Sequence, residues 1–329
     1  MKKAKIAAAA LVSAALVLWI GQIGGIREYV QEVRNQWEEE IAVEVWGPAT
    51  AGEQLMEIIK LEAERRKQAP IDAKVDHVWK AVPGYNGVEV DIEATYRRAA
   101  ATPGMPVKYI YKQIPPQVSL DDLGHHPIYR GNPSKPMAAF MINVAWGNEY
   151  IGPMLEILDR EHVKATFFLD GSWLKKNPDI AKEIQKRGHE ISNHAYSHPN
   201  MSRLSRERAQ QEISKTEALL KETLGVQNKW FAPPSGDYDQ QTVEIAASLG
   251  LKTVLWTLDT VDWKKPDPAS IVRKIGAGVG PGSLILMHPT QSSAEALADM
   301  IKAVRSKGLT PGTVSQTLSS ERILDEAVE

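Results

Sequence analysis

The stretch KATFFLDGSWLKKNPDIAKEIQKRGHEISNH, residues 164–194, decides the fold. It begins with an apolar, strand-like run at 165–169 and continues through a helix-like segment at 178–187. A second short run, 190–193, ends just before His194. Strand and helix patterns that alternate in this way predict parallel strands joined by crossover helices. The stretch therefore indicates an α/β architecture.

The same alternation extends outward over residues 136–318. Further strand-like apolar runs stand at 138–144, 251–256 and 283–287. Helix-like stretches separate these runs, at 150–160, 206–223, 239–249 and 294–306. We expect an open doubly wound sheet or a barrel, with the functional side chains at the carboxyl ends of the strands.

Histidines follow two of these strands. His194 and His198 are four residues apart, and on one turn of a helix both imidazoles would reach a single ion. His288 ends the run 283–287 and is a candidate general acid. Asp262 follows another apolar run, and a carboxylate that lies near His288 would fix the tautomer of that imidazole. The alternatives are a surface histidine pair and a buried, hydrogen-bonded histidine.

These motifs together resemble the polysaccharide deacetylase family, also called the NodB homology domain or carbohydrate esterase family 4. The matching segments are Lys164–Leu169, Gly188–His194, Asp262-Trp263 and Leu286–Pro289. The resemblance implies a distorted (β/α) barrel that removes acetyl groups from chitin-like or peptidoglycan glycans. It also implies a divalent ion, usually zinc, held by one aspartate and two histidines. The chain looks most like the membrane-anchored, sporulation-associated branch of that family.

The resemblance assigns a role to individual residues. His194 and His198 match the two histidine ligands of the metal, His288 matches the catalytic acid, and Asp262 matches the aspartate that tunes that acid. The substrate-binding positions are Trp263 in the groove, Leu286 near the acetyl methyl group, and Pro234 and Ser235 in the oxyanion loop. The family usually has tyrosine where this chain has Ser235, but a backbone N–H performs the work there.

The first motif of the family, a strand ending in Thr-Phe-Asp-Asp-Gly, is degenerate. Ala145 stands where the family has the aspartate that deprotonates the attacking water, and Trp146 stands where it has the metal-binding aspartate. The arginine expected before Pro-Pro is Ala232. Ala145 cannot accept a proton, and two neutral imidazoles alone bind zinc weakly. We therefore predict impaired hydrolysis and a zinc ion that is weakly held or absent.

Three side chains are candidate substitutes for the lost carboxylates. Asn143 projects to the same side of its strand as Ala145, but an amide is no base at neutral pH. Glu149 and Asp170 are carboxylates near the motif, and the simpler interpretation makes them surface or capping residues. Two hypotheses result: a pseudoenzyme that binds acetylated cell-wall glycan, or an active metal-dependent de-N-acetylase that uses Glu149 or Asp170 as its carboxylate and His288 as its acid.

The N-terminal segment predicts a location. Three lysines precede an apolar run at 6–26 that is long enough to span a bilayer. We expect an uncleaved anchor with the rest of the chain outside the cell membrane; secretion after signal cleavage is the alternative. The remaining expected parts are a stalk at 27–49, a small α+β module at 50–115, a linker at 116–135 and a C-terminal tail at 319–329. A third hypothesis places the function in the 50–115 module, through interaction with a partner.

The composition narrows the function classes. The formal net charge is −2, which does not suit a nucleic-acid binder because such a protein needs a basic surface. The chain has no cysteine, so disulfides and thiolate metal sites are excluded.

Overall fold

The computed structural model describes residues 50–323. The predicted anchor at 1–26, the predicted stalk at 27–49 and the last residues of the tail lie outside the described residues. Within residues 50–323, no helix is both long enough and apolar enough to cross a membrane.

Contacts divide the described chain into two compact units. The smaller holds residues 50–62 and 92–107, and the larger holds 63–91 and 108–323. This division differs from the boundary expected at residue 115, because 63–91 and 108–115 belong with the larger unit.

The segment before the deacetylase-like region contains two helices and two short antiparallel strand pairs, and the second helix lies between the strands of the second pair. Its helices are α3 (Ala51–Arg66) and α4 (Ile92–Ala101). Strands β1 (Lys74–Asp76) and β2 (Lys80–Val82) pair antiparallel, as do β3 (Gly87–Val90) and β4 (Tyr111–Ile114). Helix α4 is rich in alanine, the residue with the highest helix propensity.

The central sheet is curled, parallel and of half-barrel form. Its strand order is β10-β11-β5-β6-β7-β8-β9, and every neighbouring pair is parallel. The strands are β5 (Met137–Val144), β6 (Thr166–Leu169), β7 (Glu190–Asn193), β8 (Trp230–Phe231), β9 (Lys252–Thr253), β10 (Leu258–Asp259) and β11 (Ser283–Met287). The sheet confirms the predicted α/β class.

Strand β5 has three partners rather than two. One edge pairs with β11. The other edge is divided: β12 (Thr310–Gly312) pairs with residues 137–139, and β6 pairs with residues 141–144. All eight residues of β5 are buried, which suits a strand at the centre of a covered sheet.

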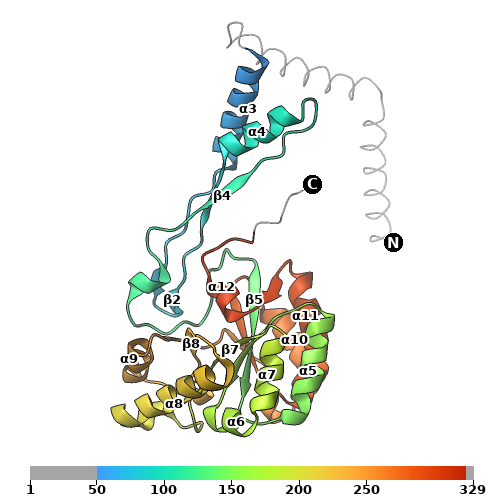
Figure 1. Cartoon of the computed structure of the whole chain (residues 1–329). Coiled ribbons are helices and arrows are strands. Elements are labelled where there is room, and N and C mark those ends of the chain that lie inside the picture. The colour runs from blue at the N-terminus through green and yellow to red at the C-terminus, as the bar shows by residue number, and fades with distance from the viewer. Residues whose placement is uncertain (1–49, 324–329) are drawn as a thin grey trace, which may run out of the picture. The chain divides into compact units, whose positions relative to one another are not determined.

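All but the last of the helices after β5 connect strands and cover the outer face of the sheet (Figure 1), whereas the last helix follows β12 and packs Val314 and Leu318 against the inner face. They are α5 (Asn148–Arg160), α6 (Gly171–Lys176), α7 (Pro178–Lys186), α8 (Arg206–Leu224), α9 (Gln240–Ser248), α10 (Pro268–Gly278), α11 (Gln291–Ser306) and α12 (Val314–Leu318). Five of them match the expected helical stretches. Sequence periodicity missed α6, α10 and α12.

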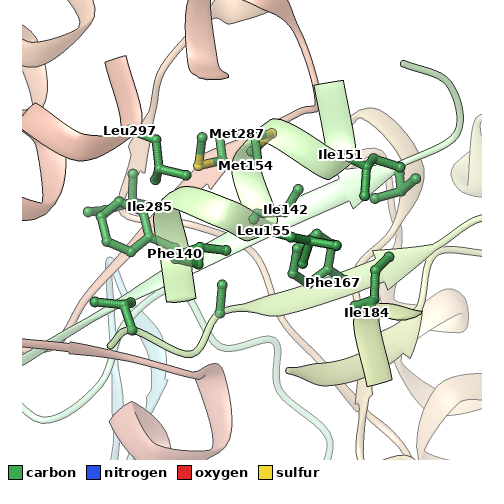
Figure 2. Close-up of a cluster of buried hydrophobic side chains, with 14 of the residues drawn as sticks. Phe140, Ile142, Ile151, Met154, Leu155, Phe167, Ile184, Ile285, Met287 and Leu297 are labelled. Carbon is green, nitrogen blue, oxygen red and sulfur yellow. The ribbon is translucent and has the colours of Figure 1, made fainter. Parts of the chain in front are cut away.

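The two faces of the sheet pack into different clusters. Phe140 and Ile142 of β5 face outward and meet helix side chains such as Met154 and Leu297 (Figure 2). Ala139 and Met141, the alternate residues, face the inner cluster. Each large apolar side chain buried in this way contributes about 1.5–3 kcal/mol. Consecutive side chains of a strand point to opposite faces, so the alternation also sets the face to which the first residue after each strand points.

Candidate functional site

The paired histidines lie just past the carboxyl end of β7. His194 is 1% exposed, and its Nδ1 lies 2.7 Å from the carbonyl oxygen of Ala232. This contact orients the ring and turns Nε2 away from the Ala232 carbonyl. The His198 ring stands edge-on to it, with 5.1 Å between ring centroids. The structure therefore brings the two predicted ligands together.

The backbone that carries the pair is a loop, so the predicted helical turn is wrong. Ala195 and His198 have φ values of 59° and 56°, in the left-handed region. The buried carboxylate of Glu212 on α8 accepts the N–H groups of Tyr196 and Ser197, at 3.1 and 2.8 Å. A side chain from a distant helix thus satisfies these donors in place of helical carbonyls. Sequence analysis missed Glu212, because nothing local links it to the loop.

Burial governs the charge of both imidazoles. Burial is the main reason that the pKa of His194 falls to about 3, and the neighbouring His198 lowers it further. Burial also lowers the pKa of His198. Both rings are therefore neutral at pH 7, the form of histidine that binds metals.

A second cluster surrounds His288, which follows β11. Fully buried Asp262 accepts from the backbone N–H of His288 at 2.6 Å and lies 2.8 Å from its Nδ1. The Ser293 hydroxyl donates to the same carboxylate. Burial alone would raise the pKa of Asp262, but the bonds from His288 and Ser293 outweigh it and hold that pKa below its usual value. An ionised Asp262 keeps the proton of His288 on Nδ1, so Nε2 faces away from this carboxylate.

Trp146 lies against the other side of His288. The two rings are stacked, with centroids 5.2 Å apart and planes 20° apart. The Trp146 side chain is nevertheless 44% exposed. Gly147, next in the chain, has φ 82°, and a Cβ atom there would lie 1.9 Å from the Pro289 carbonyl oxygen. The loop after β5 is therefore pressed against the segment after β11.

The remaining predicted substrate-binding residues are spread along the same edge. Trp263 directly follows Asp262 and is 55% exposed, with Lys264 Nζ 4.9 Å above its ring. Leu286 is buried in β11. Pro234 is buried and Ser235 has φ 55°, within the short turn Pro234–Gly236 that follows β8 and Ala232.

Two candidate substitutes have buried oxygen atoms without partners. Asp170 is the N-cap of α6: its Oδ1 accepts from Trp173 N at 2.9 Å and from the Ser172 hydroxyl at 2.6 Å. Its Oδ2 is buried and has no hydrogen-bond partner, and the same holds for Oδ1 of Asn143. Burial raises the pKa of Asp170. Glu149 is instead exposed, in the first turn of α5.

Strand register places Asp170 between two site positions. Leu169 pairs with Val144 on one side and with Asn193 on the other. The next residues along these strands are Ala145, Asp170 and His194, which therefore follow three neighbouring strands at one edge. Phe168 faces the inner cluster, so alternation turns Asp170 to that same face.

Comparison with known proteins bears on what this edge does. The family model for polysaccharide deacetylase matches residues 130–254. A peptidoglycan-N-acetylglucosamine deacetylase of Bacillus cereus is 32% identical over 219 residues, covering 62% of this chain and 80% of that protein. This chain belongs to the polysaccharide deacetylase family.

Other proteins are more similar to this chain still. The uncharacterised protein YlxY of Bacillus subtilis is 45% identical over 82% of this chain and 85% of its own length. The crystal structure of BA3943 from Bacillus anthracis, described as a carbohydrate esterase family 4 pseudoenzyme, superimposes with a TM-score of 0.77 at 41% identity. The superposition covers 82% of this chain and 96% of the BA3943 chain. A BA3943 mutant described as having restored enzymatic activity matches at 40% identity, with a TM-score of 0.76.

Polysaccharide deacetylases are typically metal-dependent, and the residues of this chain do not fit the family's ligand set of one aspartate and two histidines. The two imidazoles are in place, but indole has no metal-binding lone pair to offer at Trp146. Across residues 50–323, no group of three His, Cys, Asp or Glu side chains is arranged to hold an ion. Neither Glu149 nor Asp170 therefore completes a set with the histidines.

Proposed function

We propose that this polysaccharide deacetylase homologue binds acetylated cell-wall glycan, peptidoglycan or chitin-like, and that its hydrolytic activity is impaired. The observation that carries the proposal is the Trp146 indole, which lies on His288 where the family has a carboxylate. The Asp262–His288 pair is intact, while Ala145 supplies no base. A positioned base contributes typically about 10²–10⁴-fold to the rate of hydrolysis, so its loss is large.

The metal belongs to the same proposal. Two neutral imidazoles without an anionic ligand bind a divalent ion less tightly than the complete set does. We expect zinc to be held weakly or to be absent. The description of BA3943 as a pseudoenzyme, and of its mutant as having restored activity, supports this interpretation for a chain that is 41% identical to it.

Two measurements on the purified protein test the proposal. The first measures glycan binding by calorimetry, with N-acetylglucosamine oligomers and soluble peptidoglycan fragments. The second measures acetate release from the same glycans with added zinc or cobalt. Binding without acetate release is the expected result. Acetate release that is lost in a His288→Ala variant would overturn the proposal of impairment.

Asp170 supports a second candidate function, residual deacetylation. Asp170 follows β6, the strand beside the one that Ala145 follows. Its Oδ2 is buried and has no hydrogen-bond partner. Burial raises the pKa of Asp170, which favours a role as proton acceptor. In this candidate, Asp170 takes the proton from the attacking water. Asp170→Asn keeps the Oδ1 acceptor that caps α6 and removes only the base. If acetate is released by the wild type at a rate that Asp170→Asn leaves unchanged, this candidate is wrong.

We also propose that the protein acts outside the cell membrane. The support is the basic and apolar pattern of residues 1–26. Protease treatment of intact protoplasts should degrade the chain, whereas protection from protease would contradict this location.

A further inference from the structure

If no hydrolysis occurs, the retained Asp262–His288 pair must have a role other than acid catalysis. A buried carboxylate such as Asp262 is costly to maintain, because an ionised group loses hydration when it is buried. Here it is satisfied by three donors from His288 and Ser293. That network serves acid catalysis in an active enzyme, but Ala145 leaves the acid without a base to work with.

The structure shows what the network holds in this chain. His288 is fixed by two bonds to Asp262, one through its backbone and one through its ring. Trp146 stacks on the ring that these bonds fix. The backbone beside the indole is also fixed, because Gly147 touches the Pro289 carbonyl too closely to admit any side chain. The side chain of Trp146 is therefore held by the His288 ring, and its main chain is held by the contact between Gly147 and Pro289.

An exposed, immobilised indole is suited to binding sugar. Trp146 is 44% exposed although one of its faces is covered by His288. A large aromatic face buries considerable apolar area on contact, and one that is already ordered loses little entropy when it binds. The apolar face of a pyranose ring is a partner of matching size and chemistry. Trp263, also exposed, follows Asp262 directly and provides a second aromatic surface from the same cluster.

We propose that Trp146 is a stacking platform for a pyranose ring of the glycan, and that Asp262 and His288 are retained as positioning residues for this platform. The position of the lost metal ligand is thereby a binding position. This inference rests on the proposed glycan binding and specifies the surface that carries it.

The first test replaces the platform. Trp146→Ala is expected to weaken binding of an N-acetylglucosamine oligomer by about tenfold or more in calorimetry, corresponding to about 1.4 kcal/mol. Trp146→Phe keeps an aromatic face and should retain most of the affinity. Tyr111→Ala is the matched control, since Tyr111 is also an exposed aromatic residue but lies on β4, and it should bind as the wild type does.

The second test replaces the support. His288→Asn can still donate to Asp262 through its amide but offers no ring for stacking. It should weaken glycan binding nearly as much as Trp146→Ala. The double variant should lose little more than either single variant, because both changes remove the same platform. Additive losses in the double variant would show that His288 acts independently of Trp146.

The outcomes separate this inference from the function beneath it. If the wild type binds glycan and Trp146→Ala binds equally well, the platform is wrong and glycan binding stands. If His288→Asn binds normally while Trp146→Ala does not, the supporting role of the acid pair is wrong. If the wild type binds neither N-acetylglucosamine oligomers nor peptidoglycan fragments, the proposed function fails and the platform with it. Urea unfolding of each variant verifies that it is folded.

Discussion

The two sides of this site have diverged to different extents. On the side of β11, Asp262, His288 and Ser293 form a buried, fully hydrogen-bonded network. On the side of β5, Ala145 and Trp146 occupy the two positions at which the family has charged residues. One side is a connected polar network, and the other is aliphatic and aromatic.

This contrast has a physical origin. A charged group at a solvent-facing strand end can be replaced by an apolar one without leaving a partner buried and unpaired. Removing Asp262 would instead leave the donors of His288 and Ser293 unsatisfied inside the protein. The network side is therefore constrained by stability as well as by function, whereas the β5 side was constrained mainly by chemistry.

Restoring the charges on the β5 side is expected to have the largest effect. The triple variant Ala145→Asp, Trp146→Asp and Ala232→Arg regains the base, the third metal ligand and the residue that orients the base. Its rate of acetate release with zinc should exceed that of the wild type by about 10²-fold or more. The measurement is acetate release from N-acetylglucosamine oligomers.

The matched control uses Asn in place of both aspartates and keeps Ala232→Arg. It has nearly the same shape but offers no base and no anionic ligand, so it should stay as inactive as the wild type. A folded triple variant with an unchanged rate would show that these positions do not correspond to the family's first motif.

Breaking the network side should have a smaller effect on rate but a clear effect on stability. Asp262→Ala is expected to lower the free energy of unfolding by about 3 kcal/mol, because it leaves buried donors without an acceptor. Asp262→Asn should cost less, since its amide oxygen still accepts. Urea denaturation at pH 7 measures both. A loss of stability equal to that of a surface control such as Asp299→Asn, an exposed residue paired with Lys302, would contradict the structural role of the network.

The pH dependence of stability provides a check on the same residue. The folded-state pKa of Asp262 is lowered from 3.8, so its stabilising contribution is fully present above that unfolded-state value. The contribution is lost as pH falls through the lower, folded-state pKa. The wild type should therefore lose stability between pH 4 and more acidic values more steeply than Asp262→Asn, as measured by unfolding in urea at each pH.

The smallest expected effect concerns the oxyanion loop. Ser235 has φ 55°, a conformation that costs a residue with a side chain about 1 kcal/mol relative to glycine. Ser235→Gly should raise the free energy of unfolding by up to about that amount, offset partly by the greater freedom of glycine in the unfolded chain. A decrease in stability would show that the serine side chain contributes a favourable contact.

Much of the fold could be predicted because its signals are local. The apolar run of β5 and the pattern of α5 show their periodicity within their own residues. Helix α10, which begins at a proline and contains two glycines, and the two-residue strand β8 did not. Strand β8 is too short to show a period and is defined by its pairing with β7 and β9. The loop at 194–198 was predicted as a helical turn because the four-residue histidine spacing suits one, but Glu212 on α8 stabilises another backbone.

The site was predictable as a set of residues but not as a set of contacts. Resemblance indicated Asp262 and His288, which do lie in contact. Nothing in the local sequence indicated that the Ser293 hydroxyl would donate to the Asp262 carboxylate, or that the Trp146 indole would stack on the His288 ring. Both contacts join segments that are adjacent only after β5 and β11 have paired.

The divided edge of β5 has a consequence for how the protein is made. Both β11 and β12 come from the last part of the chain, yet they pair with a strand that begins at residue 137. A nascent chain released or stalled before residue 283 presents the most apolar strand of the sheet with one whole edge unpaired, and unpaired edges promote association between chains. The ribosome must therefore deliver nearly the entire domain before its centre can close, and truncated products are expected to aggregate rather than to fold in part.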